Sequence, residues 1–163
     1  MNTVYLILGG NKGNKRQNLL MAVEKIEAVT GVITKKSEIF VTAAWGNTDQ
    51  PDFYNQALQL KTELPPRELL EKLLKIEEEL GRTRTAEKWQ ERTMDIDILF
   101  YNSSIIAEEK LTIPHPFLQD RKFVLVPLAA IAGDFIHPVL QLSVNKLLSN
   151  CTDVLEVKAL QTT

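Results

Sequence analysis

The chain begins with an apolar run, Val4–Leu8, which ends at Gly9 and Gly10. A run of this kind, closed by glycines, indicates a central strand of a sheet. Apolar residues then recur at helical spacing, and Gly31 ends this pattern. A central strand followed directly by a helix favours folds in which helices pack on a sheet.

The alternation of strand and helix patterns continues along the chain. Strand patterns cover Val32–Thr42, Phe53–Leu60, the stretch that ends at Tyr101, and short segments around Ile105-Ile106 and Leu111–Ile113. Helix patterns run from Pro65-Pro66 to a stop at Gly81, and over Phe123–Ala132 and Val144–Leu148. This order predicts an α+β fold of ferredoxin-like type, an antiparallel-rich sheet with helices packed on it in two or three layers.

Length and composition restrict the class of protein. The 163 residues fit one domain, so residues 1–163 are expected to form a single domain. Contents of 44% hydrophobic and 25% charged residues are typical of soluble globular proteins, and a net charge of −2 disfavours general nucleic-acid binding. A single cysteine, Cys151, excludes an internal disulfide. No stretch resembles a transmembrane helix or signal peptide, so no membrane partner and a cytoplasmic location are expected.

A basic loop that leads directly into an acidic strand is the clearest functional feature. Four cationic side chains of this loop can hold phosphate oxygens: Arg82, Arg84, Lys88 and Arg92. The alternating strand pattern that follows places Asp95 and Asp97 on one face, roughly 7 Å apart. At an effective dielectric constant of about 20 the two carboxylates repel each other by about 2 kcal/mol. Mg²⁺ prefers such oxygen ligands and would reverse this repulsion, so the segment predicts a metal–nucleotide site.

Two ordinary interpretations of the same segment stay open. Arginines often lie on a solvated surface, and alternating aspartates can simply face outward from a strand. The two groups can also neutralise each other as surface ion pairs, which contribute little to stability. Their adjacency in the sequence favours a functional site, because both would converge on one end of one strand.

Five blocks of the sequence are distinctive when taken together: Asp49–Ala57, Gly81–Arg84 with Trp89, Arg92–Ile98, Leu111–Pro116 and Arg121–Leu128. In this order they resemble the 6-hydroxymethyl-7,8-dihydropterin pyrophosphokinase family of folate biosynthesis, over Leu6 to about Pro138. The resemblance implies transfer of the pyrophosphoryl group of ATP to the hydroxymethyl oxygen of the dihydropterin, with release of AMP. The implied partners are these two small molecules, and a monomer is expected, although the sequence does not determine the oligomeric state.

The resemblance also implies catalytic roles. Asp95 and Asp97 would hold two Mg²⁺ ions, one on the phosphates and one near the attacking hydroxyl. Activation of the hydroxyl by metal is favoured over Asp95 as a general base. Arg82, Arg84 and Arg92 lie on the family's mobile catalytic loop and would contact phosphates when it closes.

Substrate-binding roles follow from the same resemblance. The nucleotide site would comprise Arg82, Arg84, Trp89, Arg92, the backbone of Ile98, Lys110, Thr112, His115 and Arg121. For the pterin, Phe53 and Phe123 would sandwich the flat ring, and the Asn55 amide would bond its edge. The backbone of Thr42, Ala43 and Trp45 would complete this edge recognition. Ordinary packing is the alternative for Trp89, Phe53 and Phe123, and a bond to a backbone carbonyl is the alternative for His115.

Three positions depart from the family pattern. Gly10 stands where serine is usual, Lys110 stands where arginine is common, and Ala43-Ala44-Trp45 replaces a loop richer in proline. Lysine lacks the planar fork of arginine, so bidentate phosphate contact at position 110 is in question. Two other functions stay open at this point: a two-metal nucleotidyl transferase or cyclase, and a non-catalytic binding module on a ferredoxin-like sheet.

Overall fold

The computed structural model describes residues 1–43, 51–81 and 93–160. Its strands are β1 (Asn2–Gly10), β2 (Val32–Lys36), β3 (Phe40–Thr42), β4 (Phe53–Thr62), β5 (Asp95–Tyr101), β6 (Ile106–Glu108), β7 (Leu111–Ile113) and β8 (Val157–Ala159). Its helices are α1 (Lys15–Val29), α2 (Pro66–Glu79), α3 (Lys122–Ala132) and α4 (Val144–Asn150), with a short 3₁₀ turn at Leu118–Asp120. In the described ranges, no helix is long and apolar enough to cross a membrane.

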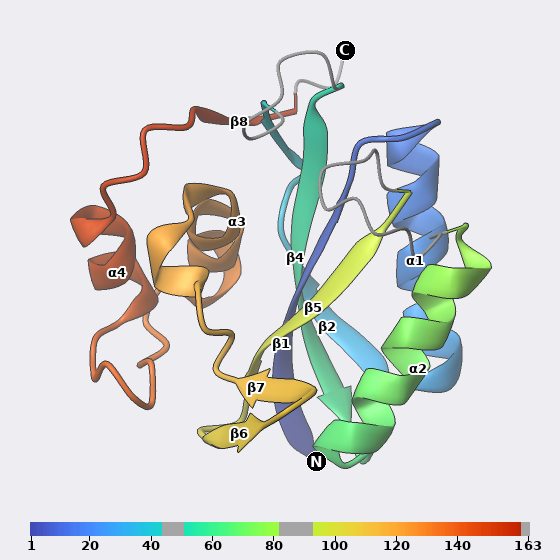
Figure 1. The fold of residues 1–163 in the computed structure, drawn as a ribbon, viewed down its shortest axis with the longest axis horizontal. Helices are drawn as coiled ribbons and strands as arrows, with labels where there is room; N and C mark the ends of the chain where they lie inside the picture. The colour runs from blue at the N-terminus through green and yellow to red at the C-terminus, as the bar shows by residue number, and fades with distance from the viewer. Residues whose placement is uncertain (44–50, 82–92, 161–163) are drawn as a thin grey trace.

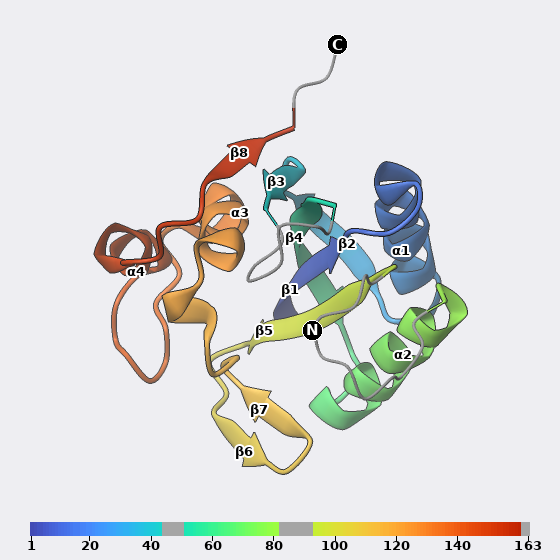
Figure 2. The same ribbon diagram turned by 45° about the horizontal axis from the view of Figure 1, so that its top comes forward.

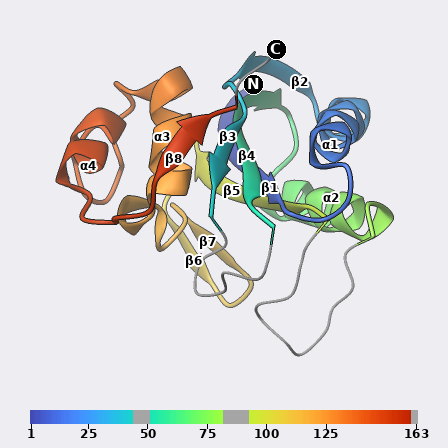
Figure 3. The ribbon, with the colours of Figure 1, turned by 90° about the horizontal axis from the view of Figure 1, so that it is seen from above.

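The main sheet has the strand order β5-β1-β4-β3-β8, and β2 also pairs with β4. The pairings of β1 with β4, β1 with β5, and β2 with β4 are antiparallel. The order β5-β1-β4-β2 is therefore the ferredoxin-like arrangement predicted from the sequence. Helices α1 and α2 cover one face and α3 and α4 lie on the other, which makes three layers (Figures 1 and 3). The hairpin β6–β7 lies below the lower end of β5, apart from the sheet (Figures 1 and 2).

Local sequence signals explain the two helices of the first face. The Asn14 side chain accepts a hydrogen bond from the Gln17 amide and caps α1. Pro65 and Pro66 begin α2, where a missing N–H costs nothing. Gly81 follows α2 with φ of +95°, a conformation that suits glycine. The start at Pro66 and the stop at Gly81 agree with the sequence predictions, whereas the Asn14 cap was not predicted.

Each face of the sheet has its own apolar core. On one face, α1 and α2 pack against Val4, Leu6 and Leu8 of β1. On the other face, α3 and α4 pack against Tyr5 and Ile7. The alternation along β1 therefore supplies both cores from one strand, as expected for a central strand.

The predicted strand over Val32–Thr42 is wrong in its middle. The structure has two strands, β2 and β3, and residues 37–39 between them are not part of a strand. The Ser37 hydroxyl accepts the Ala57 amide at 2.9 Å, in place of a backbone carbonyl. Strand β8 was not predicted; it is a short, mostly exposed segment that forms only by pairing with β3.

Candidate active site

The strand register brings predicted pterin and metal residues into one row across the sheet. Gly9 of β1 lies opposite Asn55 of β4 on one side and opposite Asp95 of β5 on the other. In the next row Ile7 lies between Ala57 and Asp97. Residues directly opposite each other in antiparallel strands point to the same face. Asn55, Asp95 and Asp97 therefore share the face on which α3 packs.

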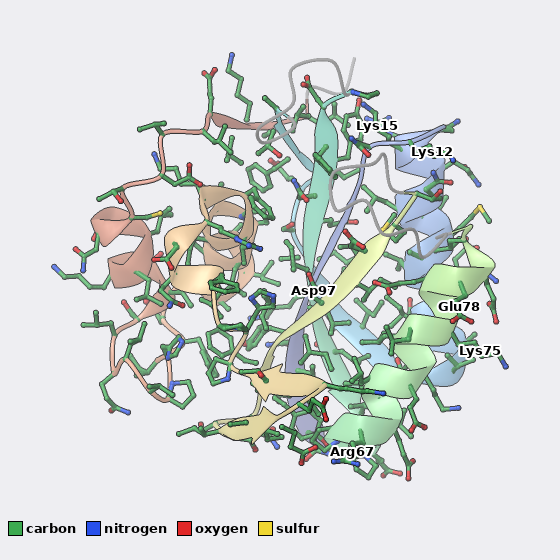
Figure 4. All side chains as sticks on the ribbon, viewed as in Figure 1. Lys12, Lys15, Arg67, Lys75, Glu78 and Asp97 are labelled. Carbon is green, nitrogen blue, oxygen red and sulfur yellow. The ribbon has the colours of Figure 1, made fainter. Side chains whose placement is uncertain are left out.

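The alternation of β5 displays the two carboxylates. Ile96 and Ile98 are buried in the core beneath α1 and α2, whereas Asp95 is half-buried and Asp97 is exposed. Figure 4 shows Asp97 beside β5, on the side toward α3. The prediction that both aspartates share one strand face is confirmed. Asp95 and Asp97 each have an interaction partner within the protein.

The neighbouring amide is held rigidly. Asn55 is buried, and its Nδ2 donates to Thr42 Oγ1 at 3.1 Å. Thr42 thus contributes its side chain through this contact, and Ala43 is exposed directly after β3. The Asn55 side chain passes so close to Gly9 that a Cβ atom there would overlap Asn55 Oδ1. Gly9 was not among the predicted site residues; a glycine inside a strand is the signal for such a close approach.

Aromatic and basic side chains from α3 and its N-terminal side lie on the same face. Phe53 begins β4, and Phe123 is the second residue of α3; both are half-buried. The Arg121 guanidinium lies over the Phe117 ring at 5.1 Å and over the Phe123 ring at 5.8 Å. The Asp153 carboxylate accepts the Lys122 amide at 3.0 Å and so caps α3 from the C-terminal segment. Predicted residues of the nucleotide and pterin sites thus meet at the start of α3.

His115 is fixed between β5 and Arg121. Its backbone N–H donates to the Leu99 carbonyl of β5 at 3.1 Å. Its Nδ1 accepts the Phe117 amide at 3.3 Å, so this ring nitrogen bonds a backbone N–H and not the backbone carbonyl considered as the alternative. Burial, and then the positive charge of Arg121, lower the pKa of His115 to about 4. The ring is therefore neutral at pH 7, and the acceptor role of Nδ1 assigns the proton to Nε2.

The remaining described residues of the predicted nucleotide site differ in placement. The Ile98 side chain is buried on the opposite face, so only its backbone can serve the site. Thr112 is exposed on β7. Lys110 is exposed in the turn of the β6–β7 hairpin, which is joined to the start of α2 by the Arg67–Glu108 ion pair.

The chemistry of the acidic pair fits Mg²⁺. Two carboxylates supply hard oxygen ligands, and Mg²⁺ commonly takes one or two carboxylates and completes its shell with water and substrate phosphates. Across residues 1–43, 51–81 and 93–160, no cluster of three or more His, Cys, Asp or Glu side chains is suited to a metal. The pair therefore fits a cation that arrives with phosphates better than one held in a closed protein cage.

One buried carboxylate near the site was not predicted. Glu77 of α2 is only 2% exposed, and its Oε2 accepts the Ile96 amide at 2.6 Å. Its signal in the sequence is an acid four residues after Leu73, inside the apolar stripe of the helix. Five residues of the predicted site lie outside the described residues, and their roles stay predictions: Trp45, Arg82, Arg84, Trp89 and Arg92.

Known proteins resemble this chain in sequence and in fold. Residues 5–133 match the family model described as 7,8-dihydro-6-hydroxymethylpterin-pyrophosphokinase (HPPK). A 2-amino-4-hydroxy-6-hydroxymethyldihydropteridine pyrophosphokinase of Aquifex aeolicus is 44% identical over 139 residues, covering 85% of this chain and 86% of that protein. The protein of the same name from Haemophilus influenzae is 40% identical over 139 residues, with the same coverage of 85% and 86%.

A solved structure shares the fold. The Plasmodium falciparum HPPK-DHPS structure with pteroate superposes with a TM-score of 0.74 at 18% identity. The superposition covers 91% of this chain and 42% of that longer chain, and at this identity it shows the fold alone. The family model and the two close relatives decide the classification: the chain belongs to the 7,8-dihydro-6-hydroxymethylpterin-pyrophosphokinase family.

Proposed function

We propose that Asp95, Asp97 and Asn55 form the centre of the site at which this chain performs the reaction of its family. The reaction transfers the pyrophosphoryl group of ATP to the hydroxymethyl group of 6-hydroxymethyl-7,8-dihydropterin and yields AMP and the pterin diphosphate, a step of folate biosynthesis. ATP and the dihydropterin are its two small-molecule substrates. A monomer in the cytoplasm is part of this proposal.

The row Asn55–Gly9–Asp95 is the observation that carries the proposal. Neighbouring strands lie about 4.8 Å apart, so the two outer positions are roughly 10 Å apart. An amide that suits the edge of a pterin thus stands two strands away from a carboxylate that suits a metal. Gly9 between them has no side chain, and the Asn55 side chain passes close to it. This arrangement supports binding of the ring at Asn55 with its hydroxymethyl group directed toward Asp95.

Asp95 and Asp97 would hold two Mg²⁺ ions. When bound, such ions neutralise phosphate charge and lower the pKa of the substrate hydroxyl. The aspartates therefore act by holding and orienting, and no protein base is required to take the hydroxyl proton. The exposure of Asp97 leaves its carboxylate accessible to incoming ligands.

Other described residues would orient the substrates. The Thr42 hydroxyl engages one amide hydrogen of Asn55 and so fixes the direction in which its oxygen points. Neutral His115 can donate from Nε2 to a nucleotide oxygen, and Arg121 adds positive charge beside it. Phe123 presents an aromatic surface at the same place. Phosphoryl transfer depends mainly on such positioning and charge neutralisation.

Nucleotide analysis tests the reaction. The protein is incubated with ATP, Mg²⁺ and the dihydropterin, and the products are separated by chromatography. We expect AMP and pterin diphosphate in equal amounts, and no AMP when the pterin is omitted. Formation of ADP would contradict pyrophosphoryl transfer. Release of free pyrophosphate would indicate the nucleotidyl transferase or cyclase alternative, which the family match does not favour, as it does not favour a non-catalytic module.

A further inference from the structure

Glu77 occupies an apolar position with a charged side chain. The buried residues of α2 are Leu69, Leu73, Ile76 and Glu77, and Glu77 is 2% exposed. A carboxylate removed from water is costly unless hydrogen bonds compensate it. A leucine at this position would continue the stripe, so the acid is retained against the preference of the core. Its contacts indicate why.

The carboxylate of Glu77 contacts the backbone between the two aspartates of the site. Its Oε2 accepts the N–H of Ile96 at 2.6 Å, a short distance typical of charge-assisted hydrogen bonds. Ile96 is flanked directly by Asp95 and Asp97. The bond therefore fixes the Asp95–Ile96 peptide group, which joins Asp95 directly and lies one residue from Asp97.

The location of β5 explains the need for this bond. Strand β5 lies at one end of the sheet order, beside β1. On its other side α2 packs close by (Figure 1), and Ile96 donates to this helix. The first residues of β5 are thus held between β1 and a side chain of α2. Without this acceptor, the Ile96 N–H at the edge of the sheet would lose its hydrogen bond. The first residues of β5 would then lose the contact that holds them against α2.

We propose that Glu77 is a positioning residue, which holds the Asp95–Asp97 pair in the geometry that binds divalent cations. This proposal rests on the proposed function. Glu77 acts through its hydrogen bond to the backbone of Ile96, the residue between the two aspartates. Partners that orient metal ligands commonly change metal affinity by about 10–100-fold when they are removed.

Two substitutions of Glu77 distinguish the effect of its hydrogen bond from the effect of its buried charge. Glu77→Leu matches the apolar stripe in size and removes the acceptor, whereas Glu77→Gln keeps an acceptor oxygen and removes the charge. Glu71→Leu, at an exposed position of the same helix, is the control. Thermal unfolding of each variant shows that it is folded before other measurements are compared.

The readouts distinguish positioning from a merely structural role. Binding of Mn²⁺ with a non-hydrolysable ATP analogue is measured by electron paramagnetic resonance, and the Ile96 amide is followed by ¹⁵N NMR and hydrogen exchange. For Glu77→Leu we expect faster exchange at Ile96, Mn²⁺ binding weakened by about 10–100-fold, and a matching rise in the Mg²⁺ needed for half-maximal rate. The KM for the pterin stays unchanged. Glu77→Gln restores Mn²⁺ binding to within about threefold of the original protein, and Glu71→Leu behaves like the original protein.

Several outcomes would overturn the proposal. If Glu77→Leu is folded and binds Mn²⁺ normally while Ile96 exchanges faster, Glu77 only stabilises the fold. If Glu77→Leu does not fold, Glu77→Gln decides: a tenfold loss of Mn²⁺ binding with an unchanged Ile96 amide would assign the effect to charge and not to the hydrogen bond. Failure of the proposed function is separate, because it would appear as absence of AMP with the original protein.

Discussion

The two faces of the central sheet are built from the same strands but differ in chemistry. On the face covered by α1 and α2, Leu6 and Leu8 of β1 are fully buried beside the buried Ile96 and Ile98 of β5. On the face covered by α3, the apolar series along β1 stops at Gly9, where Asn55 and Asp95 stand on the neighbouring strands. Along β1 and the first residues of β5, one face is apolar, and the other becomes polar at one end.

This difference shows how the protein combines stability with a polar site. Period-two alternation sends every second residue of β5 to the closed core and leaves the others free to carry carboxylates. The core face holds the backbone, and the opposite face uses that backbone as a rigid support. Sites on strands are held more precisely than sites on loops. The comparison therefore predicts that substitutions on the two faces separate activity from stability.

Asp97→Asn tests the polar end and should have the largest effect. The change keeps the size of the side chain and removes one charge from the proposed metal site. We expect kcat/KM to fall by about 10³-fold, equivalent to about 4 kcal/mol of lost charge stabilisation in the transition state. Since Asp97 is exposed, the melting temperature should change by no more than about 2 °C. Steady-state kinetics and calorimetry measure both; near-normal turnover would remove Asp97 from the metal site.

Leu6→Ala tests the face covered by α1 and α2. It should lower stability and leave activity nearly unchanged, which is the opposite of the effect of Asp97→Asn. Leu6 is fully buried and lies between Leu58 and Ile98 in the strand pairing. Loss of its packing should lower the free energy of unfolding by about 2–5 kcal/mol. Urea unfolding gives this value, and the rate per folded molecule at 25 °C should stay within about twofold. A large loss of turnover in a folded variant would show that the two faces are not independent.

Gly9→Ala tests the point on the face covered by α3 where the apolar series along β1 stops, and it should have the smallest effect. Its added Cβ would overlap Asn55 Oδ1 and displace the amide proposed to bind the pterin. We expect the KM for the pterin to rise about tenfold, equivalent to about 1.4 kcal/mol, with the KM for ATP unchanged.

The matched control for this substitution is Gly133→Ala, which crowds the side chain of Asn145, the second residue of α4. Substrate titrations with both variants compare the two crowded asparagines. Equal changes in pterin KM would mean that the effect is not specific to Asn55, and a rise in the KM for ATP alone would place the pterin elsewhere.

Local sequence patterns were sufficient to predict most helices and strands and the placement of Asp95 and Asp97 on one strand face. The alternation around Asp95 and Asp97 predicted their shared face, because a strand has a period of two whatever surrounds it. The helix limits at Pro66 and Gly81 depend on neighbouring residues, and they were visible in the sequence for the same reason. The interruption at Ser37 was not visible, since a hydroxyl replaces a backbone acceptor only when Ala57 lies opposite it.

The sequence by itself determined the α+β class, the polarity of β5 and, through its ordered blocks, the family. Only the tertiary structure decided which residues meet. Asn55, Gly9 and Asp95 are far apart in the chain, and the register of three strands sets them in one row. Glu77 and Ile96 are joined in the same way, by the packing of a helix against a strand. Such contacts depend on long-range pairing, and no local pattern encodes which partner a buried acid or a strand glycine will find.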